Sequence, residues 1–373
     1  MRFVFCACLL ALNGVAGLAA ESKPAWQTEW EKTLAAAEKE GQLTAYIFDS
    51  GPLTRGAVQV FERAYPKIKV DQLRGRGSDL GPRIIAERRA GKFLADIFAG
   101  GKGTAYATLY PAKSLDPIKP LLLLPEVLDE TKWWQGKHKY VDAEGRYIFA
   151  YVGNGGGVEI NYNTSLLNPK EFKSYWDLVN PKWKGKIVAT DPRVRGMDTP
   201  VLFFYYHPKL GPEFIKKLYG AMDVTLTRDY RQPIDWLAVG RFVLCIPCVG
   251  DEMEKAIRQG LPLGQILDLQ EGGTLSSAGG TLSVMSQAPH PNATKVFVNW
   301  LLSREGQIQV QKGRKDRPRT GSNSLRIDIP KDDVPEMNLR KDGFDYFDGD
   351  DDRFSDRRPA DKLFDEVLGK AGK

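Results

Sequence analysis

Strand-like and helix-like segments alternate over residues 25–101, and this alternation constrains the fold more than any other feature. Three short runs of branched and aromatic apolar residues are predicted to be strands, at 43–48, 68–73 and 95–98. Between them lie two segments with apolar residues at helical spacing, each preceded by a glycine-containing turn. Such a β-α-β-α-β order predicts a parallel sheet covered by helices on both faces. A helix that begins after Pro24 and ends at Gly41 precedes it.

A second series of strands and helices begins near residue 147. Segments 147–152 and 158–162 are strand-like, and the glycine-rich run 153–157 joins them. Three further strands are expected, at 186–189, 242–246 and 281–286. Because the chain has 373 residues, we expect two domains, each large enough to bury its own core.

The first twenty residues are typical of a secretory signal peptide. Arg2 is followed by ten apolar residues, 3–12, and then by small residues. A membrane span takes about 20 apolar residues, so this run is too short to be one. A buried N-terminal strand or helix is the alternative interpretation. We predict that residues 1–20 are removed on export, together with Cys6 and Cys8, and that the mature protein is soluble.

The charge balance argues against a nucleic-acid-binding protein. Lys and Arg total 53 against 47 Asp and Glu, and the net charge of +6 is spread over the whole chain. Nucleic-acid binding requires basic residues clustered on one face. We therefore expect no nucleic-acid partner, and we expect a monomer.

Two cysteines remain after export, Cys245 and Cys248, with Ile-Pro between them. Three interpretations stay open: a disulfide that closes a small loop, a pair of buried thiols, and a redox-active dithiol. Nothing else in the sequence resembles a thioredoxin domain, and no second Cys or His pair stands at the spacing of a zinc site. We expect a structural role for the pair.

An Asp-rich segment follows Arg340. The run 348–352 contains four Asp residues, but their spacing misses the EF-hand pattern and no Glu occupies its twelfth position. We expect a solvated acidic loop rather than a calcium site, followed by a helix near 363–368.

Polar turns that precede helices are the candidate ligand-binding segments. Free backbone N–H groups and the positive end of the helix dipole favour anions there, and Arg binds carboxylate or phosphate through two parallel hydrogen bonds. These turns supply Asp49, Ser50, Gly51, Arg74, Arg76, Ser78, Gly101, Lys102, Arg193, Arg195 and Gly196. Tyr230 is a candidate aromatic wall. The alternative is that the arginines point into solvent or pair with nearby Asp, and that Tyr230 belongs to the core.

Three segments resemble the iron-type family of extracellular solute-binding proteins. Residues 176–192 read WDLVNPKWKGKIVATDP, and residues 288–307 read APHPNATKVFVNWLLSREGQ, similar to that family's middle and late signatures. Residues 240–263 fit its strand-then-helix pattern with a closing Gly-Leu-Pro. The segments keep the family's order and spacing, so the resemblance covers nearly all of the mature chain.

The resemblance implies the type 2 periplasmic-binding fold, an α/β fold whose two lobes are joined by two crossing strands and hold a ligand in the cleft between them. It implies a periplasmic protein without enzymatic activity or cofactor, which delivers a solute to the permease of an ABC importer in the inner membrane. The first lobe is expected at 22–148 with 281–373, and the second at 149–280. With the basic turns, this leads us to expect a small organic anion, either a carboxylate or a phosphorylated compound.

Ferric ion is the alternative ligand, since part of this family carries it. Those members present two adjacent tyrosines just after the strand that corresponds to 242–246, where this sequence has Cys245 and Cys248. Tyr205 and Tyr206 are adjacent, but they end a predicted helix away from the cleft. No metal ligand is therefore predicted.

An exported enzyme is the rival class of protein. Three histidines occur, His138, His207 and His290, and none belongs to an H-E-x-x-H or G-x-S-x-G context. Cys245 or Cys248 is the candidate nucleophile, because one transferase group shares the fold that the resemblance implies.

Overall fold

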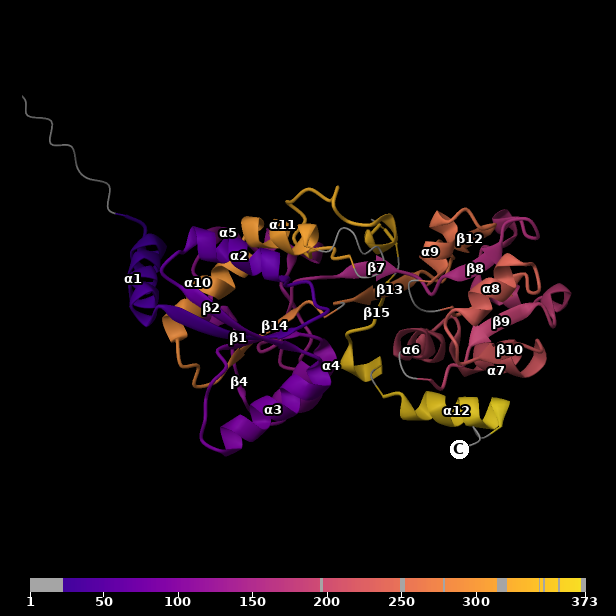
Figure 1. Ribbon diagram of the computed structural model, residues 1–373, viewed down its shortest axis with the longest axis horizontal. Coiled ribbons are helices and arrows are strands. Elements are labelled where there is room, and N and C mark those ends of the chain that lie inside the picture. The colour runs from indigo at the N-terminus through magenta and orange to yellow at the C-terminus, as the bar shows by residue number, and fades with distance from the viewer. Residues whose placement is uncertain are drawn as a thin grey trace, which may run out of the picture.

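The computed structural model describes residues 23–194, 197–248, 252–277, 279–313, 321–341, 343–344, 346–354 and 356–369. The predicted signal peptide lies outside the described residues. Figure 1 shows two α/β lobes side by side with a small sheet between them. In the described part of the chain, no helix is both long and apolar enough to span a bilayer.

The first lobe is built on a mixed sheet with strand order β2-β1-β3-β14-β6-β5, and β4 pairs with β14. β1 lies parallel to β2 and β3, with Tyr46 opposite Leu73, so the predicted parallel β-α-β-α-β order is confirmed. β14 returns antiparallel to β3. The strands are β1 (Gln42–Phe48), β2 (Lys69–Gly75), β3 (Ile97–Gly100), β4 (Leu115–Asp116), β5 (Lys139–Tyr140), β6 (Phe149–Ala150) and β14 (Thr281–Met285).

Local sequence signals set the ends of the helices that cover this sheet. α1 ends at Gly41, whose φ of 70° is a left-handed conformation that glycine adopts without strain. The side chain of Thr54 caps α2, and that of Ser303 caps α11. The helices are α1 (Ala25–Glu40), α2 (Arg55–Ala64), α3 (Gly77–Arg89), α4 (Lys102–Thr104), α5 (Pro125–Leu128), α10 (Pro291–Leu302) and α11 (Arg304–Lys312). Their apolar faces meet in one core, where Phe61 packs edge-on against Phe297 with ring centroids 4.9 Å apart.

The second lobe contains a five-stranded sheet with strand order β10-β9-β11-β8-β12. Its strands are β8 (Ile160–Asn163), β9 (Ile187–Thr190), β10 (Thr225–Thr227), β11 (Leu244–Cys245) and β12 (Leu263–Ile266). Its helices are α6 (Asp198–Tyr206), α7 (Gly211–Ala221), α8 (Gln232–Ala238), α9 (Glu252–Arg258) and α12 (Arg358–Leu368). Cys245 and Cys248 are joined by a disulfide, and both are buried in this lobe.

Three strands connect the lobes: β7 (Asn154–Gly156), β13 (Gly273–Ser276) and β15 (Tyr346–Asp348). β7 and β13 are antiparallel and correspond to the two crossing strands expected from the sequence. β15 lies parallel to β13 on the other side and adds a third strand to this central sheet (Figure 1).

The C-terminal region departs from the sequence-based expectation in two ways. Residues 281–373 were assigned to the first lobe, but α12 packs against α7, and Ala360, Leu363 and Phe364 are buried in the second core. The apolar face of α12 explains this placement. The Asp-rich run is also not a solvated loop, because β15 is paired within the central sheet and Asp350 is buried.

Candidate ligand-binding site

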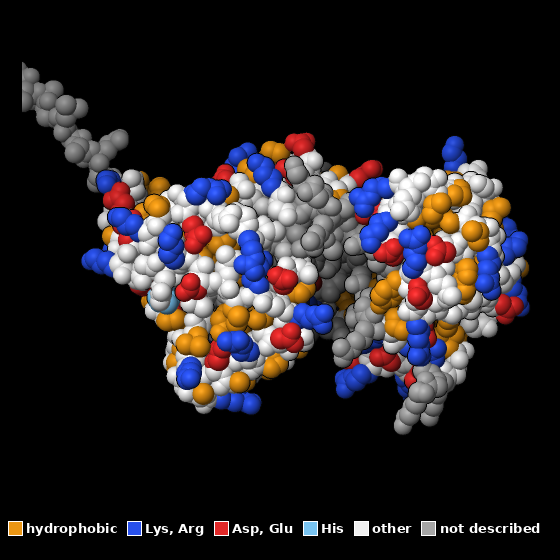
Figure 2. Space-filling model, in the orientation of Figure 1, with side chains coloured by type: hydrophobic (Ala, Val, Ile, Leu, Met, Phe, Trp, Pro, Cys, Tyr) orange, Lys and Arg blue, Asp and Glu red, His pale blue; other side chains and the backbone are white. Residues whose placement is uncertain are grey.

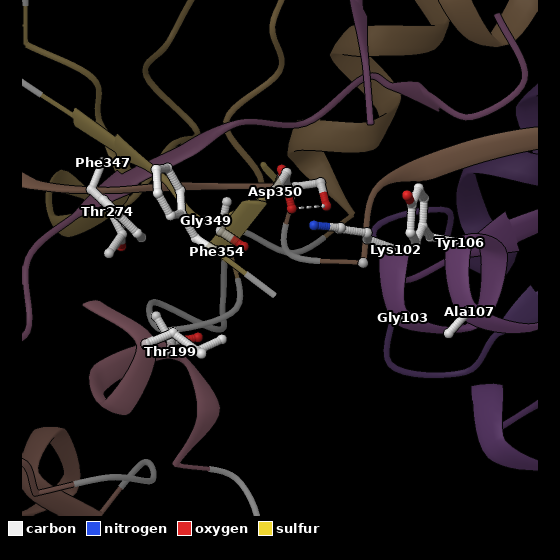
Figure 3. Close-up of a pocket in the computed structure, with 14 residues that line it drawn as sticks. Lys102, Gly103, Tyr106, Ala107, Thr199, Thr274, Phe347, Gly349, Asp350 and Phe354 are labelled. Atoms are coloured by element: carbon white, nitrogen blue, oxygen red, sulfur yellow. Dashed lines mark hydrogen bonds between the residues drawn. The ribbon is translucent and has the colours of Figure 1, made fainter. Parts of the chain in front are cut away.

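A pocket of about 420 Å³ lies where the two lobes meet the central sheet, and we call it the cleft pocket (Figure 3). Four segments line it: the start of α4 with the turn after it, the first half of α6, the end of β13 with the loop after it, and residues 347–354. A space with walls from both lobes is the usual location of a ligand in a two-lobed protein. Figure 2 shows the surface hollowed between the lobes.

The first-lobe wall carries a lysine and a tyrosine. Lys102 begins α4, which continues as a π-helix, η1 (Ala105–Leu109), and this brings Tyr106 and Ala107 to the pocket. The Lys102 ammonium lies 5.8 Å from the centroid of the Tyr106 ring, and Tyr106 stacks on Tyr110. Short π-helices are frequent at functional sites. The wall therefore offers one positive charge and one aromatic face.

The second-lobe wall is α6 together with two phenylalanines of the C-terminal region. Thr199 and Leu202 are three residues apart on α6 and therefore share the face that meets the pocket. Phe347 packs between Phe203 and Phe354, with ring centroids 6.0 and 4.8 Å away. These contacts fix the apolar part of the pocket.

The carboxylate of Asp350 is the negative charge of the cleft pocket. It accepts hydrogen bonds from the backbone N–H of Ser277 at 2.7 Å and from the Ser277 hydroxyl at 3.1 Å. Lys139 lies 3.9 Å away and is bonded more closely to Asp348, at 2.7 Å. Burial raises the pKa of Asp350 above its ordinary value, although Lys139 and Lys102 act in the opposite direction. Figure 3 shows Lys102 pointing toward this carboxylate.

The turns after β1, β2 and β3 gather around the first-lobe wall. Gly51 is buried and lies close to Gly279. A Cβ atom placed on Gly51 would be only 3.5 Å from the carbonyl oxygen of Gly279. A Cβ on Gly77 would collide with Thr104 of α4, so the turn of Arg76 and its neighbours packs on that helix. Among the residues predicted from these turns, Lys102 lines the pocket, and Gly101 is the N-cap of its helix.

The guanidinium groups of two predicted arginines are bonded to other groups of the protein. Arg74, whose side chain is 5% exposed, donates to the Leu53 carbonyl and to Gln72 at 2.7 Å each, and it lies 3.5 Å from Asp49. Arg193 forms two hydrogen bonds of 2.9 Å to the Asp191 carboxylate. The alternative that arginines pair with nearby Asp therefore holds for both. Burial alone would raise the pKa of Asp191, but the hydrogen bonds from Arg193 hold it below the ordinary value.

The other predicted residues lie outside the pocket lining or outside the description. Ser50, Arg76 and Ser78 are exposed, and Ser78 donates to the adjacent Asp79. Tyr230 is 41% exposed at the surface and is not a core residue. Arg195 and Gly196 lie outside the described residues.

The sequence analysis missed the C-terminal residues of the pocket. Gly349 and Asp350 stand in the Asp-rich run, whose composition suggested solvent exposure, and Phe347 and Phe354 stand beside it. The signal that could have found them is the aromatic pair of residues 346 and 347 before Gly349, which is typical of a short strand followed by a turn.

The described residues contain no group of three or more His, Cys, Asp or Glu side chains arranged to hold a metal ion. Tyr205 and Tyr206 lie at the end of α6, and their rings contact each other. The Tyr206 hydroxyl donates to the backbone oxygen of Asp356 at 2.8 Å. Neither tyrosine is among the residues that line the cleft pocket.

Comparison with known proteins gives one sequence relative and several related structures. No family model matches the chain. An uncharacterized protein of Haemophilus influenzae is 24% identical over 277 residues, which cover 73% of this chain and 75% of that protein.

Three solved structures of binding proteins share the architecture. The Trichodesmium protein IdiA or FutA, in complex with iron and citrate, superposes with a TM-score of 0.61 at 18% identity, covering 88% of this chain and 99% of its own. AfuA of Actinobacillus pleuropneumoniae with fructose-6-phosphate superposes with a TM-score of 0.54 at 19% identity, covering 89% of this chain and 98% of its own. Iron-bound HitA of Pseudomonas aeruginosa superposes with a TM-score of 0.54 at 16% identity, covering 87% of this chain and 99% of its own. The expectation from the sequence is therefore confirmed: the chain has the α/β fold of the type 2 periplasmic binding proteins.

Proposed function

We propose that this protein captures a small solute in the cleft pocket and delivers it to the permease of an ABC importer in the inner membrane. The observation that carries the proposal is the composition of the pocket walls, which come from both lobes and from the sheet between them. Rotation of the lobes about that sheet would open and close the walls around a solute. The predicted signal peptide places the mature protein in the periplasm, acting as a monomer.

The proposed solute carries an anionic group that binds near Lys102. The lysine begins a helix at the pocket, and the hydroxyl groups of Thr199, Thr274 and Ser276 belong to the same lining. The related structures support this class of solute, since one holds iron with citrate and another holds fructose-6-phosphate. Arg74 and Arg193 are left out of the proposed site because their guanidinium groups are bonded to other groups of the protein.

The two alternatives have less support. Bare ferric ion would need several ligating side chains together, and the described residues lack such a group of His, Cys, Asp or Glu. An enzyme with a cysteine nucleophile would need a free thiolate. Cys245 and Cys248 are instead bonded to each other and buried.

A thermal-shift experiment on ligand-stripped mature protein tests the proposal. The probes are citrate, glucose 6-phosphate, ferric ion alone and ferric citrate. A solute at 100 times its dissociation constant stabilises the fold by about 2.7 kcal/mol, which raises the melting temperature by a few degrees.

We expect a shift with at least one metal-free anion, and we expect Lys102→Gln to weaken its binding roughly tenfold or more, as for a lost charge-assisted hydrogen bond. The exposed Lys92→Gln is the control and should bind as the wild type does. A shift with ferric ion alone, or equal binding by Lys102→Gln, would contradict the proposal.

A further inference from the structure

Residues 346–354, which we call the C-terminal segment, form part of the wall of the cleft pocket. β15 is hydrogen-bonded along β13, with Gly273, Thr274 and Leu275 opposite residues 346–348. The backbone N–H of Gly349 continues this pairing by donating to the Leu275 carbonyl at 2.9 Å. The backbone contacts of the residues just before Asp350 therefore hold it in place.

Asp350 brings a carboxylate to the pocket, and burial there deprives that carboxylate of solvating water. Its side chain is 6% exposed, and Ser277 supplies two hydrogen bonds to it. A neutral asparagine could accept the same bond from the Ser277 N–H through its amide oxygen. The negative charge is thus not needed for that contact, and burying it is unfavourable.

The nearby positive charges leave this carboxylate incompletely compensated. The Lys139 ammonium lies within 2.8 Å of both oxygens of Asp348 but 3.9 Å from Asp350. The Lys102 ammonium points toward Asp350 (Figure 3), and burial still prevails over both lysines in raising the pKa of Asp350 above its ordinary value. A ligand group with a positive charge would supply the missing compensation in a low-dielectric site, where such bonds are strong.

We propose that Asp350 determines solute specificity by accepting hydrogen bonds from an ammonium group, so that the cleft pocket takes a small zwitterionic solute. The anionic end of that solute lies toward Lys102, and its ammonium lies against Asp350. This inference rests on the proposed function and narrows its solute class. Tyr106 and Phe354 line the same pocket and offer aromatic surface to the carbon skeleton of the solute.

Two matched pairs of probes test the inference on ligand-stripped mature protein by isothermal titration. The pairs are 4-aminobutyrate with butyrate, and glucosamine 6-phosphate with glucose 6-phosphate. Within each pair the anionic group is the same and only the ammonium is added or exchanged for a hydroxyl. We expect the wild type to bind the amino member of at least one pair ten times more tightly or better.

Asp350→Asn should reduce this preference to less than threefold, with the anionic partner probe bound as well as before or better. Asp268→Asn is the control, since Asp268 is 62% exposed, pairs with Lys341 and is not among the residues that line the pocket. It should retain the wild-type preference. Melting temperatures of both variants establish that they are folded.

Three results would overturn the inference: equal binding within both pairs, an unchanged preference in Asp350→Asn, or no binding of either amino probe by the wild type. None of these results would by itself overturn the proposed function. That function fails on its own test: no thermal shift with any metal-free anion, a shift with ferric ion alone, or equal binding by Lys102→Gln.

Discussion

Ser277 and Asp350 are joined by two hydrogen bonds, from the backbone N–H and the hydroxyl of the serine to the carboxylate of the aspartate. Ser277 follows β13, the strand by which the chain returns to the first lobe, and Asp350 follows β15, which leads to α12 in the second. The pair therefore ties a third connection between the lobes to one of the two crossing strands. It also places an acidic side chain at the cleft pocket.

The buried charge of Asp350 makes stability depend on pH in a defined direction. Its pKa is raised in the folded protein, so the folded state holds the proton more tightly than the unfolded state does. The ionised carboxylate therefore lowers the free energy of unfolding above its folded pKa, and this penalty vanishes below the unfolded pKa. We predict that Asp350→Asn is more stable than the wild type at pH 7 and that the difference disappears as the pH approaches the ordinary pKa of an aspartate.

Urea titrations at several pH values measure this difference. Asp361→Asn serves as a control, because Asp361 is a partly exposed acid whose partner, Arg357, is on its own helix. A wild-type protein that is more stable than Asp350→Asn at pH 7 would contradict the assignment.

Lys139 holds the C-terminal segment to the first lobe. Its side chain is 15% exposed and bonds both oxygens of Asp348 while lying near Asp350. Lys139→Gln would leave two acidic groups without their nearest cation, so we expect it to lower the free energy of unfolding by roughly 1 to 3 kcal/mol. Lys362→Gln removes an exposed ion pair with Glu366 and should change stability by less than about 0.5 kcal/mol. Equal effects of the two substitutions in urea unfolding would count against this role.

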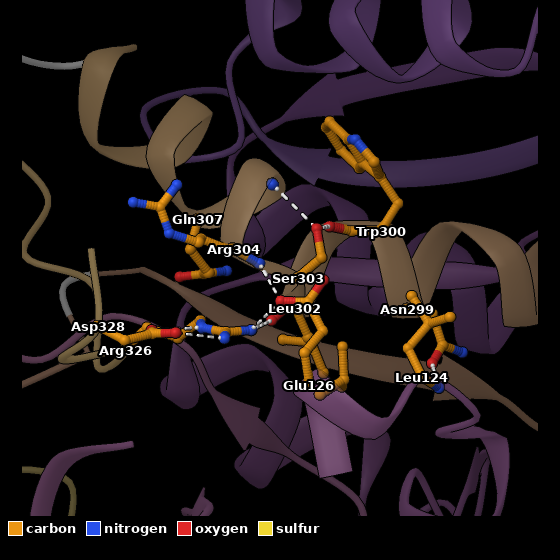
Figure 4. Close-up of polar contacts among 12 residues, drawn as sticks. Leu124, Glu126, Asn299, Trp300, Leu302, Ser303, Arg304, Gln307, Arg326 and Asp328 are labelled. Carbon is orange, nitrogen blue, oxygen red and sulfur yellow. Dashed lines mark hydrogen bonds and ion pairs between the residues drawn. The ribbon is translucent and has the colours of Figure 1, made fainter. Parts of the chain in front are cut away.

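Arg326 is an example of a guanidinium that is buried for structural reasons (Figure 4). It is 1% exposed, bonds Asp328 at 2.9 and 2.8 Å, and donates to the Leu302 carbonyl at 3.1 Å. Arg326→Met removes a buried guanidinium and its hydrogen bonds to Asp328, which is 25% exposed, and to the Leu302 carbonyl, so we expect a loss of about 2 to 3 kcal/mol in the free energy of unfolding. The matched control is Arg358→Met, because Arg358 bonds Asp356 two residues away in the same manner but is 89% exposed.

The same pair gives a second pH dependence of opposite sign. Hydrogen bonds from Arg326 lower the pKa of Asp328, so this acid contributes stability above its unfolded pKa and loses it as the pH falls through the folded pKa. Acid titration of stability should show this contribution in the wild type and not in Arg326→Met. Similar stability of the Arg326 and Arg358 variants at pH 7 would refute the structural role.

The disulfide between Cys245 and Cys248 should stabilise the fold without taking part in solute binding. The two cysteines are separated by 3 positions in the sequence. For so short a loop, the entropy that a cross-link removes from the unfolded chain corresponds to a stabilisation of about 2 kcal/mol. We predict that reduction, or Cys245→Ala with Cys248→Ala, lowers the free energy of unfolding by this amount. Binding of the anionic probes should be unchanged. Loss of anionic-probe binding in a folded double variant would contradict this prediction and indicate that the cysteines take part in solute binding.

Local periodicity was sufficient to predict the β-α-β-α-β part of the first lobe. The spacing predicts strands at 43–48 and 68–73, and the structure has β1 at Gln42–Phe48 and β2 at Lys69–Gly75. It also predicts a helix that ends at Gly41, as observed. These segments bury one or both faces, and the spacing of their apolar residues along the chain indicates that burial.

The composition of the site was less accessible from the sequence. Arg74 and Lys102 were both predicted to stand in turns, but Arg74 lies in β2 and is bonded to the Leu53 carbonyl, while Lys102 begins α4 and reaches the pocket. Which way such a side chain points depends on packing between loops, which no local pattern encodes. Asp350 reaches the pocket because β15 pairs with β13, and its bond to Ser277 spans 73 positions. An isolated Asp-rich run therefore gave no sign of burial.

The central claim, that one small solute binds in the cleft pocket, is tested most directly by native mass spectrometry of the mature protein purified without denaturation from a bacterial periplasm. Thr199→Trp places a large ring in the pocket from an exposed position on α6, and Thr28→Trp adds the same ring to the exposed surface of α1. We predict that the wild type and Thr28→Trp carry one small non-covalent solute per chain and that Thr199→Trp carries none. A wild type without solute, or Thr199→Trp with the same solute as the wild type, would contradict the account.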